Sequence, residues 1–169
     1  MTNALLVPGS GINITSSSLF SGAPTQQGTY TGFNLAPSSG LSPTLVLGDG
    51  VLLISGSANL PLTNTLNQFS GNPGNGGLLI LNSLGVPPTQ DANALSYSFT
   101  TDAMLSAVTM KFVFGTDEFP TQSVTDVFGF FVDGVNYAKF AGVELISNTP
   151  GNQTNFISNP VGSELYEIE

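Results

Sequence analysis

The chain has 169 residues, of which only 8% are charged, against about 25% in an ordinary soluble domain. Two basic residues stand against eleven acidic ones, which gives a formal net charge of −9. This balance argues against nucleic acid or an anionic membrane surface as a partner, because both are bound through Lys and Arg. The sequence contains no histidine and no cysteine, which removes the commonest catalytic base, the thiolate nucleophile and any disulfide.

The length suits one compact domain, so we expect residues 1–169 to form a single unit. No apolar run reaches the roughly 18 residues of a membrane-spanning helix, which predicts no membrane insertion in this segment. The opening MTNALLVPGSG has neither the basic region nor the long apolar region of a signal peptide. The surplus of carboxylates suits either a divalent cation held by oxygen ligands or simple solubility.

Short β-type runs separated by Gly, Pro, Ser and Asn fill the sequence and predict an all-β, mainly antiparallel fold. Their number and spacing indicate a β-sandwich or jelly roll with room for one short helix. In the first half we expect strands at residues 12–15, 28–35, 44–47 and 51–55, the last two joined in a hairpin through Gly48-Asp49-Gly50. Residues 56–77 indicate a long loop, and residues 78–84 fit either a short buried strand or one or two helical turns.

The second half of the sequence has the clearer alternation of polar and apolar residues. We expect strands at residues 94–100, 107–115, 127–132, 135–140 and 143–146, with a turn at Asp133-Gly134. The strand at 107–115 places Val108, Met110, Phe112 and Phe114 on one face. The strands at 107–115 and 127–132 are the most apolar in the chain, so we expect them at the centre of the sheet.

Four of the eleven acidic residues cluster between these two strands: Asp117, Glu118, Asp126 and Asp133. Asp117 and Glu118 come where the first strand ends, and Asp126 begins the second. This order can bring Glu118 and Asp126 together at one rim of the sheet. The presence of an aspartate at position 133 is explained by the predicted turn at Asp133-Gly134.

Three explanations of the cluster compete. Asp117, Glu118 and Asp126 could bind calcium, which takes hard oxygen ligands and needs neither His nor Cys. The same carboxylates could instead accept backbone N–H bonds and fix a tight loop. A glycoside hydrolase could use Glu118 and Asp126 as paired acid and base, but the chain has no Trp and no Arg for a sugar site, so this explanation ranks last.

The segment FVFGTDEFP, followed after a short loop by TDVFGFFVDG, resembles the choice-of-anchor L domain of bacterial surface proteins. The resemblance is strong at 108–133 and extends weakly to GSGINITSSSLFSGAP, residues 48–53 and DANALSYSFT. Phe119 stands where the family usually has Tyr, and Thr125 where it has Asn. The resemblance implies display outside a bacterium, in proteins that carry one of several alternative C-terminal anchors, and it implies no catalytic activity.

The family continues past a segment like SELYEIE into further strands, whereas this sequence stops at Glu169. We therefore expect either a fragment or a sandwich whose missing strands come from another molecule. The leading hypothesis is a non-catalytic extracellular or cell-surface module for adhesion or matrix assembly, stabilised by calcium. Its partners would be other surface proteins, polysaccharide or copies of itself. A self-assembling filament, sheath or particle subunit ranks second.

Overall fold

The computed structural model describes residues 2–40, 42–58, 72–119, 124–141, 144–149, 153–160, 162 and 165–166. These residues confirm the all-β, mainly antiparallel class with one short α-helix. In chain order the elements are η1 (Thr2–Leu5), β1 (Ile12–Ser21), η2 (Pro24–Gln26), β2 (Gln27–Leu35), β3 (Leu45–Leu53), α1 (Leu79–Asn82), β4 (Ala94–Thr101), β5 (Val127–Phe128), β6 (Phe131–Val132), β7 (Val135–Asn136), β8 (Ile146–Ser147) and η3 (Gln153–Asn155). Within these ranges no helix has the length and apolar character to cross a membrane.

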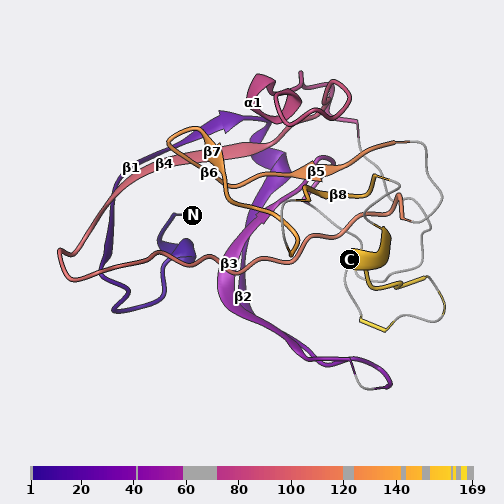
Figure 1. Cartoon of the computed structure of the whole chain (residues 1–169), viewed down its shortest axis with the longest axis horizontal. Helices are drawn as coiled ribbons and strands as arrows, with labels where there is room; N and C mark the ends of the chain where they lie inside the picture. The colour runs from indigo at the N-terminus through magenta and orange to yellow at the C-terminus, as the bar shows by residue number, and fades with distance from the viewer. Residues whose placement is uncertain are drawn as a thin grey trace.

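The strands pair two by two, all antiparallel: β1 with β4, β2 with β3, β5 with β8 and β6 with β7. Figure 1 shows β1 and β4 as one long arc, with β2 and β3 as a twisted central ribbon. In Figure 1 the β6–β7 pair is seen on the same side of that ribbon as the β1–β4 arc, and the β5–β8 pair on the other side. The stacking of two sheets into a sandwich remains a prediction.

The alternating segments of the sequence become strands close to where they were expected. The runs at 28–35 and 94–100 match β2 and β4 within a residue at each end. The run at 12–15 extends to Ser21, because its serines continue the ladder opposite β4. The predicted hairpin at Gly48-Asp49-Gly50 is wrong, since β3 runs straight through it.

Local contacts with β2 explain why the chain does not turn at residues 48–50. Gly48 has a φ of 76°, which only glycine adopts readily, and it sits opposite Phe33 at an irregularity of the ladder. The Asp49 carboxylate accepts a hydrogen bond of 2.9 Å from the Gly32 amide. Gly50 lies so close to the Tyr30 hydroxyl that a Cβ would overlap it. The Asp-Gly pair therefore makes a bulge in a continuous strand.

The ambiguous segment at 78–84 is helical, with α1 at its centre. The Thr89 hydroxyl accepts a hydrogen bond of 2.9 Å from the Leu78 amide just before the helix. Part of the predicted loop at 56–77 lies outside the described residues, and 72–77 is free of helix and strand.

The predicted strand at 107–115 is wrong as a paired strand, because these residues belong to no ladder of the described chain. The predicted strand at 127–132 is split into β5 and β6. The Phe130 amide between them donates to the side-chain oxygen of Asn136 at 3.1 Å and not to a backbone carbonyl. Asp133 and Gly134, with φ of 48° and 82°, make the predicted turn, here between β6 and β7.

The last two predicted strands are shorter than expected. The run at 135–140 pairs only as β7 and through an isolated bridge from Lys139 to Leu145. The run at 143–146 becomes β8, and residues 142–143 lie outside the described part.

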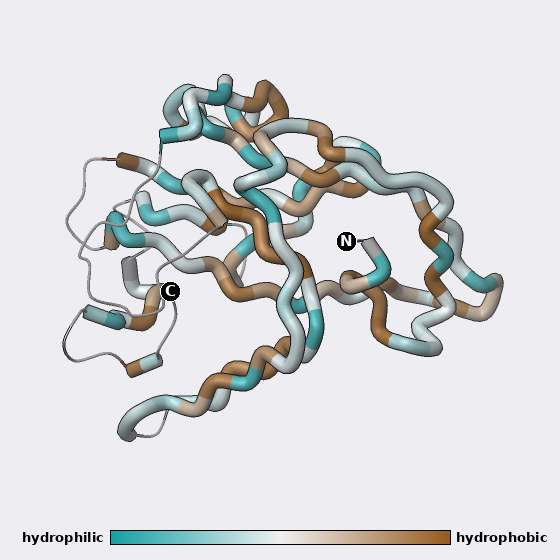
Figure 2. The backbone as a smooth tube through the Cα atoms, turned by 180° about the vertical axis from the view of Figure 1, so that it is seen from behind, coloured by the Kyte–Doolittle hydropathy of each residue, from teal (hydrophilic) through white to brown (hydrophobic). Residues whose placement is uncertain are grey.

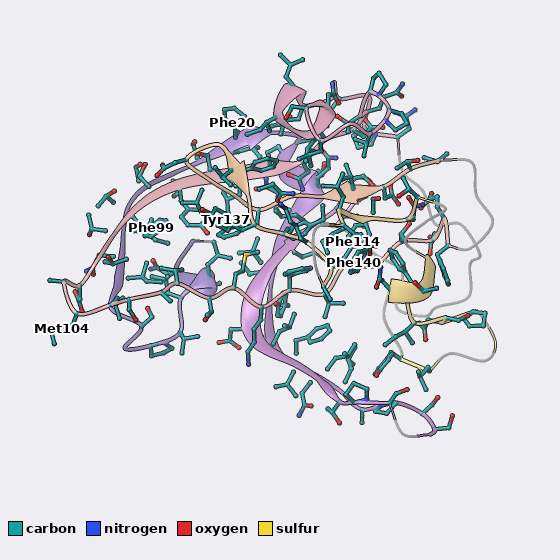
Figure 3. The ribbon with its side chains drawn as sticks, in the orientation of Figure 1. Phe20, Phe99, Met104, Phe114, Tyr137 and Phe140 are labelled. Atoms are coloured by element: carbon teal, nitrogen blue, oxygen red, sulfur yellow. The ribbon has the colours of Figure 1, made fainter. Side chains whose placement is uncertain are left out.

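Apolar residues are spread along the whole described backbone, as the brown segments of Figure 2 show. Among the described residues the buried hydrophobic side chains are Ala92, Ala138, Ile146 and Tyr166. A cluster of phenylalanine rings supplies further packing around Phe156, where the rings of Phe114, Phe119 and Phe140 lie 5.2 to 6.0 Å away between centroids. Phe114 and Phe140 are labelled together in Figure 3.

Candidate functional site

The acidic loop gathers two carboxyl groups around one hydroxyl. Thr116 Oγ1 lies 2.6 Å from Asp126 Oδ2 and 2.9 Å from Glu118 Oε2. The same hydroxyl oxygen accepts a bond of 3.2 Å from the Glu118 amide. The Glu118 and Asp126 carboxyl groups are close enough for a hydrogen bond between them to act on the pKa of Glu118. We call Thr116, Glu118 and Asp126 the carboxyl cluster.

The proton count of this cluster points to one protonated carboxyl group. A threonine hydroxyl has a single proton to donate, yet it lies at hydrogen-bonding distance from two carboxyl groups. A hydrogen bond between the two carboxyl groups likewise needs a proton on one of them. Two carboxylates this close share one proton in preference to carrying two negative charges.

The electrostatics of Glu118 agree with this count. Partial burial, together with the hydrogen bond and the negative charge of Asp126, raises the pKa of Glu118 from 4.5 to about 7. The hydrogen bonds from the Thr116 hydroxyl and from the Glu118 amide act in the opposite direction and only partly offset this. Burial is the largest cause, and the adjacent ring of Phe119 stacks on Phe156 at 5.2 Å.

Asn148 holds the second half of the loop. Its side-chain oxygen accepts a hydrogen bond of 2.8 Å from the Asp126 amide, and its side-chain nitrogen donates to the Val124 carbonyl at 3.0 Å. Its own amide donates to the Asp126 carbonyl at 3.3 Å. Asn148 is 8% exposed, directly after β8, and so it extends the β5–β8 ladder to the edge of the carboxyl cluster.

The structure thus brings Glu118 and Asp126 together, as their positions in the sequence suggested. Asp117 is exposed. In the described part of the chain no three acidic side chains come close enough to hold a metal ion between them. The calcium site at Asp117, Glu118 and Asp126 stays a prediction, with the Thr116 hydroxyl as a further oxygen beside Glu118 and Asp126.

Sequence reasoning missed Thr116 and Asn148. Thr116 had a usable signal, since it lies two residues before Glu118 and could cap the turn that follows. Asn148 had none, because it lies 22 residues from Asp126 in a stretch rich in Asn, Thr and Pro.

A second polar cluster, also missed, surrounds Gln26, which is completely buried. Its side-chain nitrogen donates to the carbonyl oxygens of Ile54, Ser55 and Asp91 at 3.3, 2.8 and 3.0 Å. Its side-chain oxygen accepts from the Ala23 amide and from the Asn75 side chain at 2.7 and 2.6 Å. We call this set the Gln26 cluster.

Asn93 completes the Gln26 cluster. Its side-chain nitrogen donates to the Gln26 carbonyl at 2.6 Å, and its side-chain oxygen accepts from Gln27 at 2.7 Å. The cluster therefore ties η2 to the residues after β3 and to those before β4.

Two apolar grooves flank the extended residues 107–113. The first, of about 350 Å³, lies between residues 44–47 at the start of β3 and residues 110–113. The second, of about 340 Å³, lies between the same segment and the β4 and β6–β7 strands. Its lining residues are Phe99, Val108, Met110, Phe112, Phe130, Val132, Tyr137 and Ala138. Among the described residues that line the grooves, Lys111 is the one with a charged side chain.

Comparison with protein-family models gives no match, and neither the curated proteins nor the solved structures contain a chain that this one matches.

Proposed function

We propose that this chain is a non-catalytic extracellular or cell-surface module that works through protein contacts, in adhesion or in matrix and surface assembly. The observation that carries the proposal is the set of exposed apolar side chains on the two grooves. Val46, Val108 and Tyr137 are 54%, 45% and 64% exposed there. Exposed apolar patches of this kind mark interaction sites. The choice-of-anchor L resemblance supports a place at the cell surface, with other surface proteins, polysaccharide or further copies as partners.

The geometry of the carboxyl cluster favours an architectural role over a catalytic one. A glycosidase keeps its two carboxyl groups about 5 Å or more apart, with the scissile bond or a water between them. Here an oxygen of Glu118 and an oxygen of Asp126 lie 2.9 and 2.6 Å from the same Thr116 hydroxyl, which occupies the space between them. Their hydrogen bonds close the loop between the end of the 107–115 segment and β5.

Calcium belongs to the proposal as a stabiliser of the same loop. A divalent ion would replace the shared proton of Glu118 and Asp126, because it binds ionised carboxylates. Its effect should therefore be stronger above pH 7 than below it. Thermal melting with and without millimolar calcium at pH 8 tests this, and a melting temperature that calcium leaves unchanged removes calcium from the proposal.

A matrix-binding experiment tests the function itself. The labelled protein is incubated with the matrix stripped from a bacterial biofilm, and the retained fraction is measured. We expect the double variant Val46→Ser with Tyr137→Ser to bind about tenfold more weakly, as for loss of central interface residues. The matched control is Leu79→Ser, which removes a side chain that is 84% exposed and lines neither groove.

Two results would contradict the proposal. One is a wild-type protein that the matrix does not retain. The other is release of reducing sugar from the matrix by wild type and not by Glu118→Gln, which would establish the hydrolase explanation.

A self-assembling subunit is the second candidate function. The exposed apolar side chains that line the two grooves suit contacts between copies of the chain as well as contacts with other proteins.

A further inference from the structure

The sequence contains a single Asn-Gly pair, Asn75-Gly76, next to the Gln26 cluster. At an Asn-Gly bond the backbone nitrogen of the glycine can attack the side-chain carbonyl carbon of the asparagine, because glycine has no Cβ to hinder the approach. Asn72, in the same segment, is followed by Pro73, whose nitrogen carries no proton and cannot react in this way. The segment 72–77 therefore holds a reactive asparagine and a matched unreactive one.

The peptide group between Asn75 and Gly76 is open to this reaction. Gly76 is exposed, and residues 72–77 belong to no helix or strand. Within the described part of the chain no hydrogen bond occupies the Gly76 N–H. The carbonyl oxygen of the same peptide group accepts a bond of 2.9 Å from the Asp91 amide. A donor on this oxygen polarises the peptide group and eases the loss of the Gly76 proton.

The side chain that would react is a member of the Gln26 cluster. Asn75 is half-buried, and its Nδ2 donates to Gln26 Oε1 at 2.6 Å. Its backbone amide donates to the Asp91 carboxylate at 2.7 Å. The reaction breaks the bond between the side-chain carbonyl carbon and Nδ2, the atom that Gln26 holds. We therefore expect the rate to depend on how often the hydrogen bond to Gln26 opens.

We propose that Asn75 is a site of spontaneous deamidation, which converts a neutral link of the Gln26 cluster into a charged one. The Gly76 nitrogen loses its proton and forms a bond to the Asn75 side-chain carbonyl carbon, and Nδ2 leaves as ammonia with that proton. Water then opens the cyclic imide to aspartate or isoaspartate. Water is the only other reactant, and nothing is oxidised or reduced. This modification goes beyond the proposed function and is independent of it.

The product no longer fits the Gln26 cluster. The aspartate product replaces the donor at Gln26 Oε1 with a carboxylate oxygen, and two acceptors cannot form a hydrogen bond. The new negative charge also lies beside the Asp91 carboxylate, which the Asn75 amide contacts. Isoaspartate in addition inserts a methylene group into the backbone that pairs with Asp91. Deamidation therefore weakens the link between η2 and the residues before β4.

Mass spectrometry of the full chain, incubated folded at mildly alkaline pH and then digested, tests the reaction. We expect conversion of amide to acid at Asn75 and none at Asn72. Gly76→Ala is the matched variant, because a Cβ at Gly76 meets no atom within 4 Å and only shields the nitrogen. We expect it to slow the reaction at least about tenfold, or about 1.4 kcal/mol in the barrier. An Asn75 that stays as intact as Asn72, or an equal rate in Gly76→Ala, would overturn the proposal.

Two aspartate variants test the effect on the Gln26 cluster without waiting for the reaction. Asn75→Asp reproduces the charged product. Asn72→Asp is the control, because the Asn72 side-chain oxygen accepts a bond of 2.9 Å from the Gly74 amide, which an aspartate keeps. We expect Asn75→Asp to lower the urea midpoint of unfolding at neutral pH and Asn72→Asp to leave it unchanged. Equal midpoints for the two variants would contradict the claimed effect on the Gln26 cluster.

Discussion

The Gln26 cluster and the carboxyl cluster both join distant segments of the chain through side-chain hydrogen bonds, but the chemical groups that form these bonds differ. The Gln26 cluster uses neutral amides, which do not titrate, and both polar atoms of the Gln26 side chain have partners. The carboxyl cluster uses two acids and one hydroxyl, and its bonds depend on a proton.

The difference separates a fixed element of the fold from a conditional one. Buried amides that are fully paired specify one arrangement, since any other arrangement leaves polar groups unsatisfied. A shared proton holds two carboxyl groups together only while it is bound. We therefore expect the half of the molecule around β1 to β4 to be insensitive to pH, and the loop at 116–126 to respond to it.

The largest effect should come from replacing the central amide. Gln26→Leu keeps the volume of the side chain but removes the donor that the carbonyl groups of residues 55 and 91 share, while the Ile54 carbonyl keeps the Asn93 donor. Each group left unpaired costs about 1 to 3 kcal/mol where water cannot reach it. We expect a loss of at least about 3 kcal/mol in the free energy of unfolding, measured by urea denaturation. Gln90→Leu is the control, because Gln90 is exposed on the surface. An equal loss of unfolding free energy in the two variants would contradict a stabilising role of the Gln26 hydrogen bonds.

Asn148→Ala should have the next largest effect. It removes one acceptor and one donor that hold Asp126 and Val124, and we expect a loss of about 2 kcal/mol in stability. Amide hydrogen exchange should show faster exchange at Asp126, and Asn3→Ala, an exposed asparagine, serves as control. An exchange rate of the Asp126 amide that Asn148→Ala leaves unchanged would contradict the role of Asn148 in holding the loop.

Thr116→Val should cost less, about 1 kcal/mol, because the carboxyl groups can still bond to each other. Thr116→Ser keeps the hydroxyl and should restore most of the loss. A threonine needed only for packing would behave in the opposite way, since valine preserves its shape and serine does not. Paired urea denaturation curves of the two variants decide between these roles.

The smallest effect is a change in pH dependence. The pKa of Glu118 is raised from 4.5 to about 7 in the folded state, so the folded protein binds an extra proton between these values. The stabilisation is complete below pH 4.5 and is lost as the pH rises through about 7. Glu118→Gln should flatten this part of the stability curve, and Glu144→Gln, at an exposed carboxylate, should not. A wild-type curve already flat between these pH values would refute the assignment.

Local patterns of the sequence predicted the strands that pair with a neighbouring strand in the fold. The alternation in 94–100 and 28–35 was enough to identify β4 and β2, because every second residue faces the same side. The same alternation in 107–115 predicted a strand, but these residues join no ladder of the described chain. Periodicity reports which side of a strand is apolar, and it carries no information on whether a neighbour is present.

The two polar clusters show a second limit of prediction from the sequence, which concerns contacts between distant residues. Glu118 and Asp126 stood out because acids are rare in this chain. Gln26 lies in a Thr-Gln-Gln run that looks like any polar turn, and its burial depends on carbonyl groups up to 65 residues away. Long-range contacts of this kind leave no local pattern, so only the folded structure identifies them.

A carbon-13 NMR titration of the Glu118 side-chain carboxyl tests most directly the claim that this pair shares a proton and closes the loop. We expect its midpoint at about pH 7, moving toward the ordinary value in Asp126→Asn, where the neighbouring negative charge is gone. A wild-type midpoint already near 4.5 and unaffected by Asp126→Asn would contradict the account.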